Sequence, residues 1–234
     1  MNFRDTMSQL KKLGTAQNRK VYARHMMLDK PDSAKMYGVS YANLGKLQKK
    51  IKVDHDLALK LWNSGNHDAR VLATMIADPD SLDKATAEEW IKECRNYIVT
   101  DSVAGVVARS TMARRKMEKW TKSKKEWVGR AGWWILAGVA GKDEELSDDY
   151  FEAYLKDIEA DIHTSKNRVR DAMNMALINI ALRNTSLEKK AVAVSKRIGK
   201  IEVDHGATSC KTPDAAEYVE KVKAYRAKRK DKSA

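Results

Sequence analysis

Apolar residues at helical spacing run along nearly the whole chain, and this pattern restricts the possible folds more than any other feature. Tyr150, Tyr154, Ile158 and Ile162, for example, recur at every fourth position. No stretch alternates apolar and polar residues as a half-buried β-strand does. The 234 residues include only 3 prolines and 11 glycines, so few positions interrupt a helix. The sequence therefore predicts an all-α protein.

The predicted helices come in pairs of roughly 35 residues, a period typical of helical repeat proteins. They cover residues 5–13, 16–28, 112–121, 124–140, 147–163, 166–183 and 187–199, with further helices between 40 and 107. The pattern favours a HEAT-like or armadillo-like α-solenoid of paired antiparallel helices, with a compact helical bundle as the alternative. We expect the repeat domain to span residues 1–200. An irregular segment and a basic C-terminal helix are expected over 201–234.

Local signals predict where several helices begin. Ser40 and Asp54 are suitable N-cap residues. The tetrapeptide TAEE at Thr86–Glu89 has the capping-box pattern, which predicts a helix start at Thr86. A second, short helix is expected from near Thr100. The last helix is expected near Pro213, since proline suits a first helical position.

Charge is abundant and unevenly distributed. The net charge is +13. Residues 109–130 hold nine basic and two acidic residues, whereas residues 141–161 hold nine acidic and two basic residues. A basic excess attracts polyanions, so a nucleic acid is the favoured partner. A solvated surface without a partner is the alternative.

Several classes of site and location are disfavoured. Cys94 and Cys210 form no disulfide framework, so we expect a reducing cytoplasm, and a nucleoid association if the source is bacterial. No signal peptide or membrane span is expected. Asp204, His205 and Cys210 lack a fourth ligand for zinc, and no nucleotide-binding glycine motif is present, so we expect no metal and no cofactor.

Four stretches then follow one another in a known order. They read YGVSYANLGKLQKKI, ALKLWNSGNHDARVLATMIADP, NYIVTDSV and EWVGRAGWWILAGVA. Together they resemble the AlkD-like DNA alkylation-repair family of HEAT-like repeat proteins, over about residues 35–185 in the helical repeat plan. The LW-SG-H-AR unit is the most specific part, and VGRAG is the next.

The resemblance implies a DNA glycosylase that releases N3- or N7-alkylated purines from double-stranded DNA without flipping the base. The family places an aromatic residue four positions before a catalytic Asp, and these positions correspond to Tyr97 and Asp101 here. The family usually has Trp at the first position, and a second family Trp falls near Met175. In such a site the carboxylate stabilises positive charge on the sugar, and the aromatic face adds cation–π stabilisation.

Other residues are expected to hold the DNA. By the same resemblance Arg130 contacts the phosphate backbone. We expect the protein to be a monomer. The remaining expected phosphate contacts are Arg109, Arg114, Arg115, Lys122 and Lys124. Trp133 and Trp134 lie about 100° apart on a helix, so one is expected in the core and the other at a DNA-facing surface.

Each of these residues also has a purely structural interpretation. Asp101 follows a predicted helix start and interacts there with the macrodipole. Tyr97 lies on the apolar side of its helix, and Arg130 can extend over Trp127 or pair with Glu126. At the level of function, the substituted Trp positions favour a non-catalytic relative that recognises branched or damaged duplex. A helical scaffold that docks a protein on its acidic segment is the third alternative.

Overall fold

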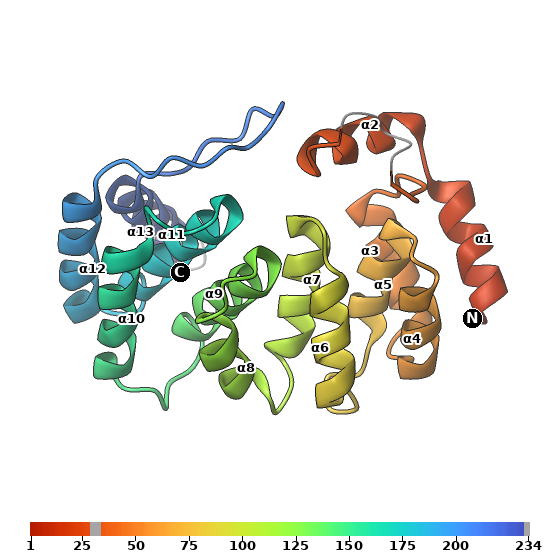
Figure 1. Ribbon diagram of the computed structural model, residues 1–234, viewed down its shortest axis with the longest axis horizontal. Coiled ribbons are helices and arrows are strands. Elements are labelled where there is room, and N and C mark those ends of the chain that lie inside the picture. The colour runs from red at the N-terminus through yellow and green to blue at the C-terminus, as the bar shows by residue number, and fades with distance from the viewer. Residues whose placement is uncertain (29–33, 232–234) are drawn as a thin grey trace. The chain divides into compact units, whose positions relative to one another are not determined.

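The computed structural model describes residues 1–28 and 34–231, and these form thirteen α-helices and no β-strand (Figure 1). The helices of the N-terminal half are α1 (Phe3–Leu13), α2 (Ala16–His25), α3 (Tyr41–Ile51), α4 (His55–Asn63), α5 (His67–Ile76), α6 (Lys84–Glu93) and α7 (Tyr97–Val107). Those of the C-terminal half are α8 (Ala113–Trp120), α9 (Glu126–Ala140), α10 (Asp148–Asp161), α11 (Asn167–Ala181), α12 (Thr185–Ile198) and α13 (Ala215–Asp231). The prediction of an all-α protein is confirmed.

The chain divides into two compact units. The first comprises Met1–Lys116 together with His205–Cys210, and the second comprises Met117–Asp204 together with Lys211–Ala234. Helix α8 crosses this division. The boundary expected near residue 200 stays a prediction. Within the described residues, no helix combines the length and the apolar character that crossing a membrane requires.

In the first unit, alternate helices pack on one another. Helix α5 packs against α3, α4 and α7, and α6 packs against α7 (Figure 1). The rings of Trp62 and Trp90 stack at 4.5 Å between α4 and α6, and the Trp62 Nε1–H donates to Glu93 at 3.0 Å. Each helix therefore buries its apolar face against a sequence neighbour and against the next pair, as in a helical repeat.

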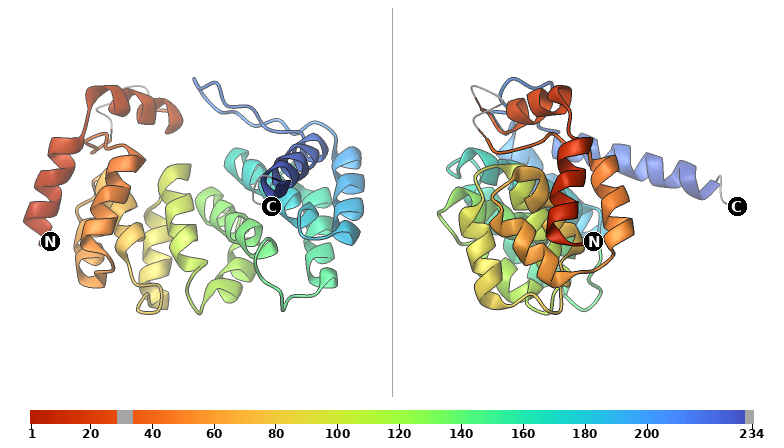
Figure 2. Two further views of the ribbon diagram at one scale, coloured as in Figure 1. Left: turned by 180° about the vertical axis from the view of Figure 1, so that it is seen from behind. Right: turned by 90° about the vertical axis from the view of Figure 1, so that its right-hand side faces the viewer.

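In the second unit, α9 and α11 form the closest helix pair, and α10 packs on α11 and α12. Helix α13 packs on α11 and α12, and its later turns extend away from them (Figure 2, right). These later turns carry the exposed basic residues Arg226, Lys228 and Arg229.

The repeat is less regular than predicted. Successive helix pairs begin at residues 55, 84, 113 and 148, so their spacings are 29, 29 and 35 residues. The third repeat is longer mainly because α9 has 15 residues, against 10 and 11 for α5 and α7, and also because its turn at residues 121–125 exceeds those at 64–66 and 94–96. Residues 199–214 contain no helix, as expected for Ile198–Cys210.

A buried carboxylate binds the segment that precedes α3 in the sequence. Asp68 is 1% exposed and accepts from the backbone N–H groups of Tyr37, Gly38 and Val39 at 2.6, 3.1 and 2.7 Å. This arrangement satisfies three donors that lie in no helix, so the segment is anchored to α5. The HDAR part of the sequence thus builds the fold.

Two predicted helix starts are confirmed and two are wrong. Asp54 and Ser40 accept from Leu57 N and Asn43 N. Helix α6, however, begins at Lys84 because Asp83 accepts from two backbone N–H groups at 2.6 and 3.0 Å, so the capping box at Thr86 does not form. Helix α7 begins at Tyr97, capped by Asn96, and not near Thr100.

Candidate functional site

The two residues expected to carry the chemistry lie one turn apart on α7. Tyr97 is the first residue of α7 and Asp101 is the fifth, so both side chains occupy the same face of the helix. The chain leaves α6 at Cys94 and enters α7 after Asn96, and this break sets the direction of α7. Both side chains are half-buried.

A pocket of about 500 Å³ opens in front of this pair, within the first unit. It is lined by Val21, Tyr22, His25, Tyr41, Tyr97, Ile98, Asp101 and Ser102. Three aromatic residues from α2 and α3 thus join Tyr97 and Asp101. None of the three stood out in the sequence, because they lie more than 50 residues before Tyr97 and nothing local marks them as its neighbours.

Hydrogen bonds fix the aromatic rings around the pocket. The Tyr97 hydroxyl and His25 Nδ1 are 2.7 Å apart, and their rings meet edge to face at 6.2 Å. The Tyr22 hydroxyl donates to the Val39 carbonyl at 2.7 Å. Burial, followed by the charge of Asp68, raises the pKa of Tyr22 to about 12. The Tyr22 phenol is therefore neutral at physiological pH.

The pKa of Tyr41 responds to the negative charge of Asp101 in the pocket. Burial raises the pKa of Tyr41, the charge of Asp101 raises it further, and a hydrogen bond with Ser102 opposes both effects. At 53% exposure, the Tyr41 ring still presents surface to solvent. The pocket thus combines one carboxylate with several aromatic rings, which is an arrangement suited to a cationic or electron-poor group.

Arg109 lies two residues beyond the end of α7. A neighbouring pocket of about 410 Å³ shares Tyr41 and Ser102 with the first pocket and reaches Arg109. The Arg109 side chain is exposed, its Nη1 donates to the Gly105 carbonyl at 2.9 Å, and partial burial lowers its pKa. Of the expected phosphate contacts, Arg109 is the one that the structure brings to the Asp101 side of α7.

Arg130, which the resemblance predicts to contact the DNA backbone, is buried, and its DNA contact stays a prediction. Its side chain is 2% exposed, and Nη1 donates to Asp171 Oδ2 at 2.7 Å and to the Arg168 carbonyl at 3.0 Å. Glu126, the alternative partner expected for Arg130, instead accepts from the backbone N–H of Arg168 at 2.8 Å. Arg130 therefore ties α9 to α11 from inside, and a phosphate would have to displace Asp171.

One of the two adjacent tryptophans is in the core, as expected. Trp133 is 4% exposed and packs edge to face on Tyr154 at 5.8 Å, so it is the core member of the pair, and its contact with DNA stays a prediction. Trp134 is half-buried, with the Arg130 guanidinium 5.3 Å from its ring centre. Met175, where the family Trp was expected, is half-buried on α11.

The other basic residues divide into two groups. Arg114, Arg115, Lys122 and Lys124 are exposed, as a phosphate-binding role requires. Lys116 is buried and pairs with Glu88 at 2.8 Å, so it links α8 to α6.

In the described part of the chain, no group of three or more His, Cys, Asp or Glu residues is arranged to hold a metal ion.

Known proteins with similar sequences include two from Listeria. Lin0241 of Listeria innocua and Lmo0209 of Listeria monocytogenes, both described as uncharacterised, are 29% identical to this chain over 197 and 198 residues. Each alignment covers 82% of this chain and 86% of the relative.

A solved structure matches the fold as well as the sequence. It has a TM-score of 0.85 and 29% identity, and the match covers 94% of this chain and 93% of the other. That protein represents a new family related to the HEAT-like repeat DNA glycosylases with affinity for branched DNA structures. The predicted HEAT-like fold is thereby confirmed. The sequence pattern of the DNA alkylation repair enzymes matches residues 6–219 of this chain. The protein therefore belongs to the DNA alkylation repair enzyme family.

Proposed function

We propose that this protein binds DNA and prefers branched or distorted duplex to regular duplex. The observation that carries this proposal is the similarity, along 94% of the chain, to a protein with affinity for branched DNA. The net charge of +13 and the exposed side chains of Arg109, Arg114, Arg115, Lys122 and Lys124 support it. These residues would hold phosphates without reading the base sequence. A cytoplasmic location follows from this proposal and stays a prediction.

Two substitutions favour binding over chemistry. The chain has Tyr97 and Met175 where the family carries indole rings, and the arginine expected to clamp the backbone, Arg130, is buried in an ion pair. A phenol has less aromatic surface than an indole, and a thioether has no π face, so stabilisation of a cationic sugar is reduced. Recognition of an unusual DNA shape needs none of these groups.

The first experiment compares a four-way junction with a linear duplex of the same sequence across a series of salt concentrations. Arg114→Gln/Arg115→Gln should weaken binding to both DNAs. The slope of log affinity against log salt concentration should become less steep by about 2, the loss expected for two phosphate contacts. Lys189→Gln/Lys196→Gln, which removes two exposed charges from α12, is the matched control and should retain wild-type binding. Wild-type binding that vanishes near physiological salt would instead favour the protein scaffold.

The second candidate is excision of N3- or N7-alkylated purines, and the Asp101 pocket favours it. The alkylated base is already a cationic leaving group, so the glycosidic electron pair departs with the base while positive charge grows at C1′ of the sugar. Asp101 would stabilise this charge and orient the water that adds to C1′. Tyr97 and Tyr41 would present their rings beside the sugar.

Base release separates the two candidates. Release of 7-methylguanine from alkylated DNA is measured for wild type, for Asp101→Asn and for Asp56→Asn, a control on α4. The excision candidate requires that Asp101→Asn alone loses activity. Equal release by all three proteins removes Asp101 from the mechanism, and no release by wild type leaves DNA binding as the function.

A further inference from the structure

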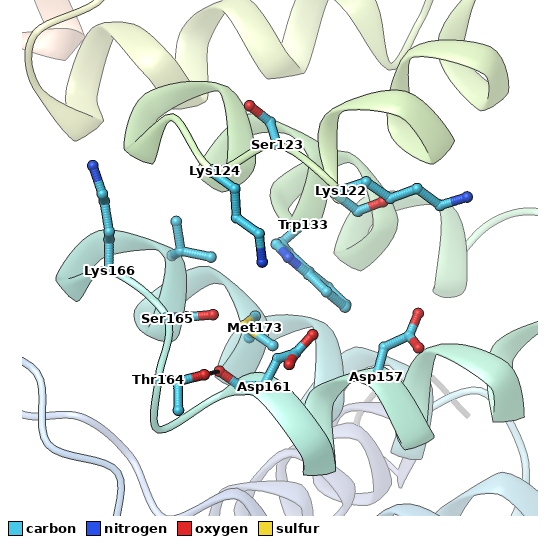
Figure 3. A pocket seen from close by; sticks show the side chains of 12 residues that line it. Lys122, Ser123, Lys124, Trp133, Asp157, Asp161, Thr164, Ser165, Lys166 and Met173 are labelled. Carbon is cyan, nitrogen blue, oxygen red and sulfur yellow. Dashed lines mark hydrogen bonds between the residues drawn. The ribbon is translucent and has the colours of Figure 1, made fainter.

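The second unit contains a pocket apart from the Asp101 pocket, and two of the proposed phosphate contacts, Lys122 and Lys124, line it. It has a volume of about 460 Å³ and lies between the connection from α8 to α9 and the connection from α10 to α11 (Figure 3). The first connection contributes Lys122 and Lys124, and the second contributes Thr164, Ser165 and Lys166. Because every lining residue belongs to the second unit, the pocket is complete within that unit.

Charges of opposite sign line different walls of this pocket. Asp157 and Asp161 lie one turn apart on α10, and Lys124 projects toward them from the opposite wall (Figure 3). No ion pair found in the described residues joins either carboxylate to Lys122, Lys124 or Lys166. Burial and then the charge of Asp161 raise the pKa of Asp157, which Lys122 partly offsets. The two carboxylates are thus left facing a cavity.

Apolar side chains occupy the space between these walls. The indole of Trp133 projects between Lys124 and the two aspartates (Figure 3). Its edge-to-face contact with Tyr154 holds it in place. Met173 and Val169 of α11 complete the apolar surface and are 1% and 7% exposed. A flat ring placed here would contact an aromatic side chain and a thioether.

The chemistry of the three parts defines the ligand. A phosphate alone is attracted by the lysines but repelled by the two carboxylates. A simple cation is attracted by the carboxylates but repelled by the lysines. A nucleotide satisfies all three parts, because it joins an anionic phosphate to a flat base whose amino group donates to a carboxylate. The lysines supply the positive charge of this site, because the Glu126 carboxylate already accepts from the Arg168 backbone N–H at the start of α11.

We propose that this pocket binds a single unpaired nucleotide of a DNA strand. The phosphate would lie on Lys124 and Lys166, the base would lie against Trp133 and Met173, and its amino edge would face Asp157 and Asp161. This inference rests on the proposed function, since branched and distorted DNA supplies such nucleotides, whereas paired bases have their edges occupied. Thymine has no amino group, so the pocket should discriminate against it.

The test compares three junctions that differ at one position, with an unpaired cytosine, an unpaired thymine or no unpaired base. Wild type should bind the cytosine junction about tenfold more tightly than the thymine junction, as expected for one base-edge contact. Asp157→Asn/Asp161→Asn should reduce this ratio to about twofold or less. Glu144→Gln/Glu145→Gln removes the same charge from exposed positions and should keep the ratio. A ratio cancels any general gain in affinity that results from losing negative charge.

The outcomes separate this inference from the proposed function. Tight junction binding without cytosine preference, or a preference that survives in Asp157→Asn/Asp161→Asn, overturns the pocket assignment alone. Loss of all DNA binding by wild type overturns the proposed function. In that case, titration with dCMP and with TMP, followed by the indole N–H resonance of Trp133, tests the pocket directly. A response to dCMP that exceeds the response to TMP supports the assignment, and equal responses overturn it.

Discussion

His67 illustrates how position in the fold sets the charge of a single residue. The side chain is 6% exposed at the start of α5, with its ring 5.7 Å from that of Tyr22. Burial lowers the pKa of His67 to about 4, although the neighbouring charge of Asp68 opposes the shift. His67 is therefore neutral at pH 7. Its ring packs against Tyr22, which lines the Asp101 pocket.

This shift predicts that acid destabilises the first unit. Below the ordinary pKa of about 6.5, the unfolded chain binds a proton at His67 that the folded chain does not bind. The free energy of unfolding therefore decreases as the pH is lowered. Between pH 6.5 and 5.0 wild type should lose about 1.5 kcal/mol more than His67→Gln, and the loss should be complete near pH 4. Urea denaturation at several pH values measures this difference. Equal pH dependence of the two proteins would contradict it.

Residue identity alone did not separate structural from functional charges. Arg130, Lys116 and Asp68 occur in distinctive sequence motifs or basic stretches, and all three are buried and satisfied inside the protein. Whether a charged side chain faces a partner helix or solvent depends on the packing of distant elements. That information is absent from local spacing.

Helix α9 shows the same principle for an element, because two of its three glycines, Gly132 and Gly138, have different roles. A Cβ on Gly132 would lie 2.3 Å from the Thr121 nitrogen and 2.5 Å from the Trp120 carbonyl carbon, whereas a Cβ on Gly138 meets nothing within 4 Å. Gly132 thus permits the end of α8 to lie directly against α9. The VGRAG motif encodes this close approach.

The two glycines predict opposite effects of the same substitution. Gly132→Ala forces backbone atoms apart and should destabilise the protein by about 2–3 kcal/mol. Gly138→Ala should stabilise it by up to about 1 kcal/mol, because alanine favours the helical state. Thermal denaturation of both variants provides the comparison. A neutral Gly132→Ala would show that α8 and α9 are less tightly packed than described.

Helix number and type could be predicted from the sequence, but some helix ends could not. Apolar spacing identified the long helices of the C-terminal half to within a few residues. The starts at Thr86 and Thr100 were wrong because Asp83 and Asn96 provide better caps three or four residues earlier. The break at Cys94–Asn96 contains neither glycine nor proline, so the N-cap Asn96 is the one local signal that marks it.

For the whole molecule, the predictable part of the Asp101 site is the part that lies within one helix. Tyr97 and Asp101 share a face because they are four residues apart on α7. Tyr22, His25 and Tyr41 complete the pocket from α2 and α3, and their proximity results from the packing of the first unit. The pocket of the second unit likewise combines three helices and two connections and has no sequence signature.

The most direct measurement of the central claim is the ratio of dissociation constants for a linear duplex and a four-way junction of the same sequence, at physiological salt. Phosphate contacts alone give similar affinities for the two DNAs, because they depend mainly on charge density. We predict that wild type binds the junction at least tenfold more tightly. Equal affinities for the two DNAs, or no binding to either, would contradict the account.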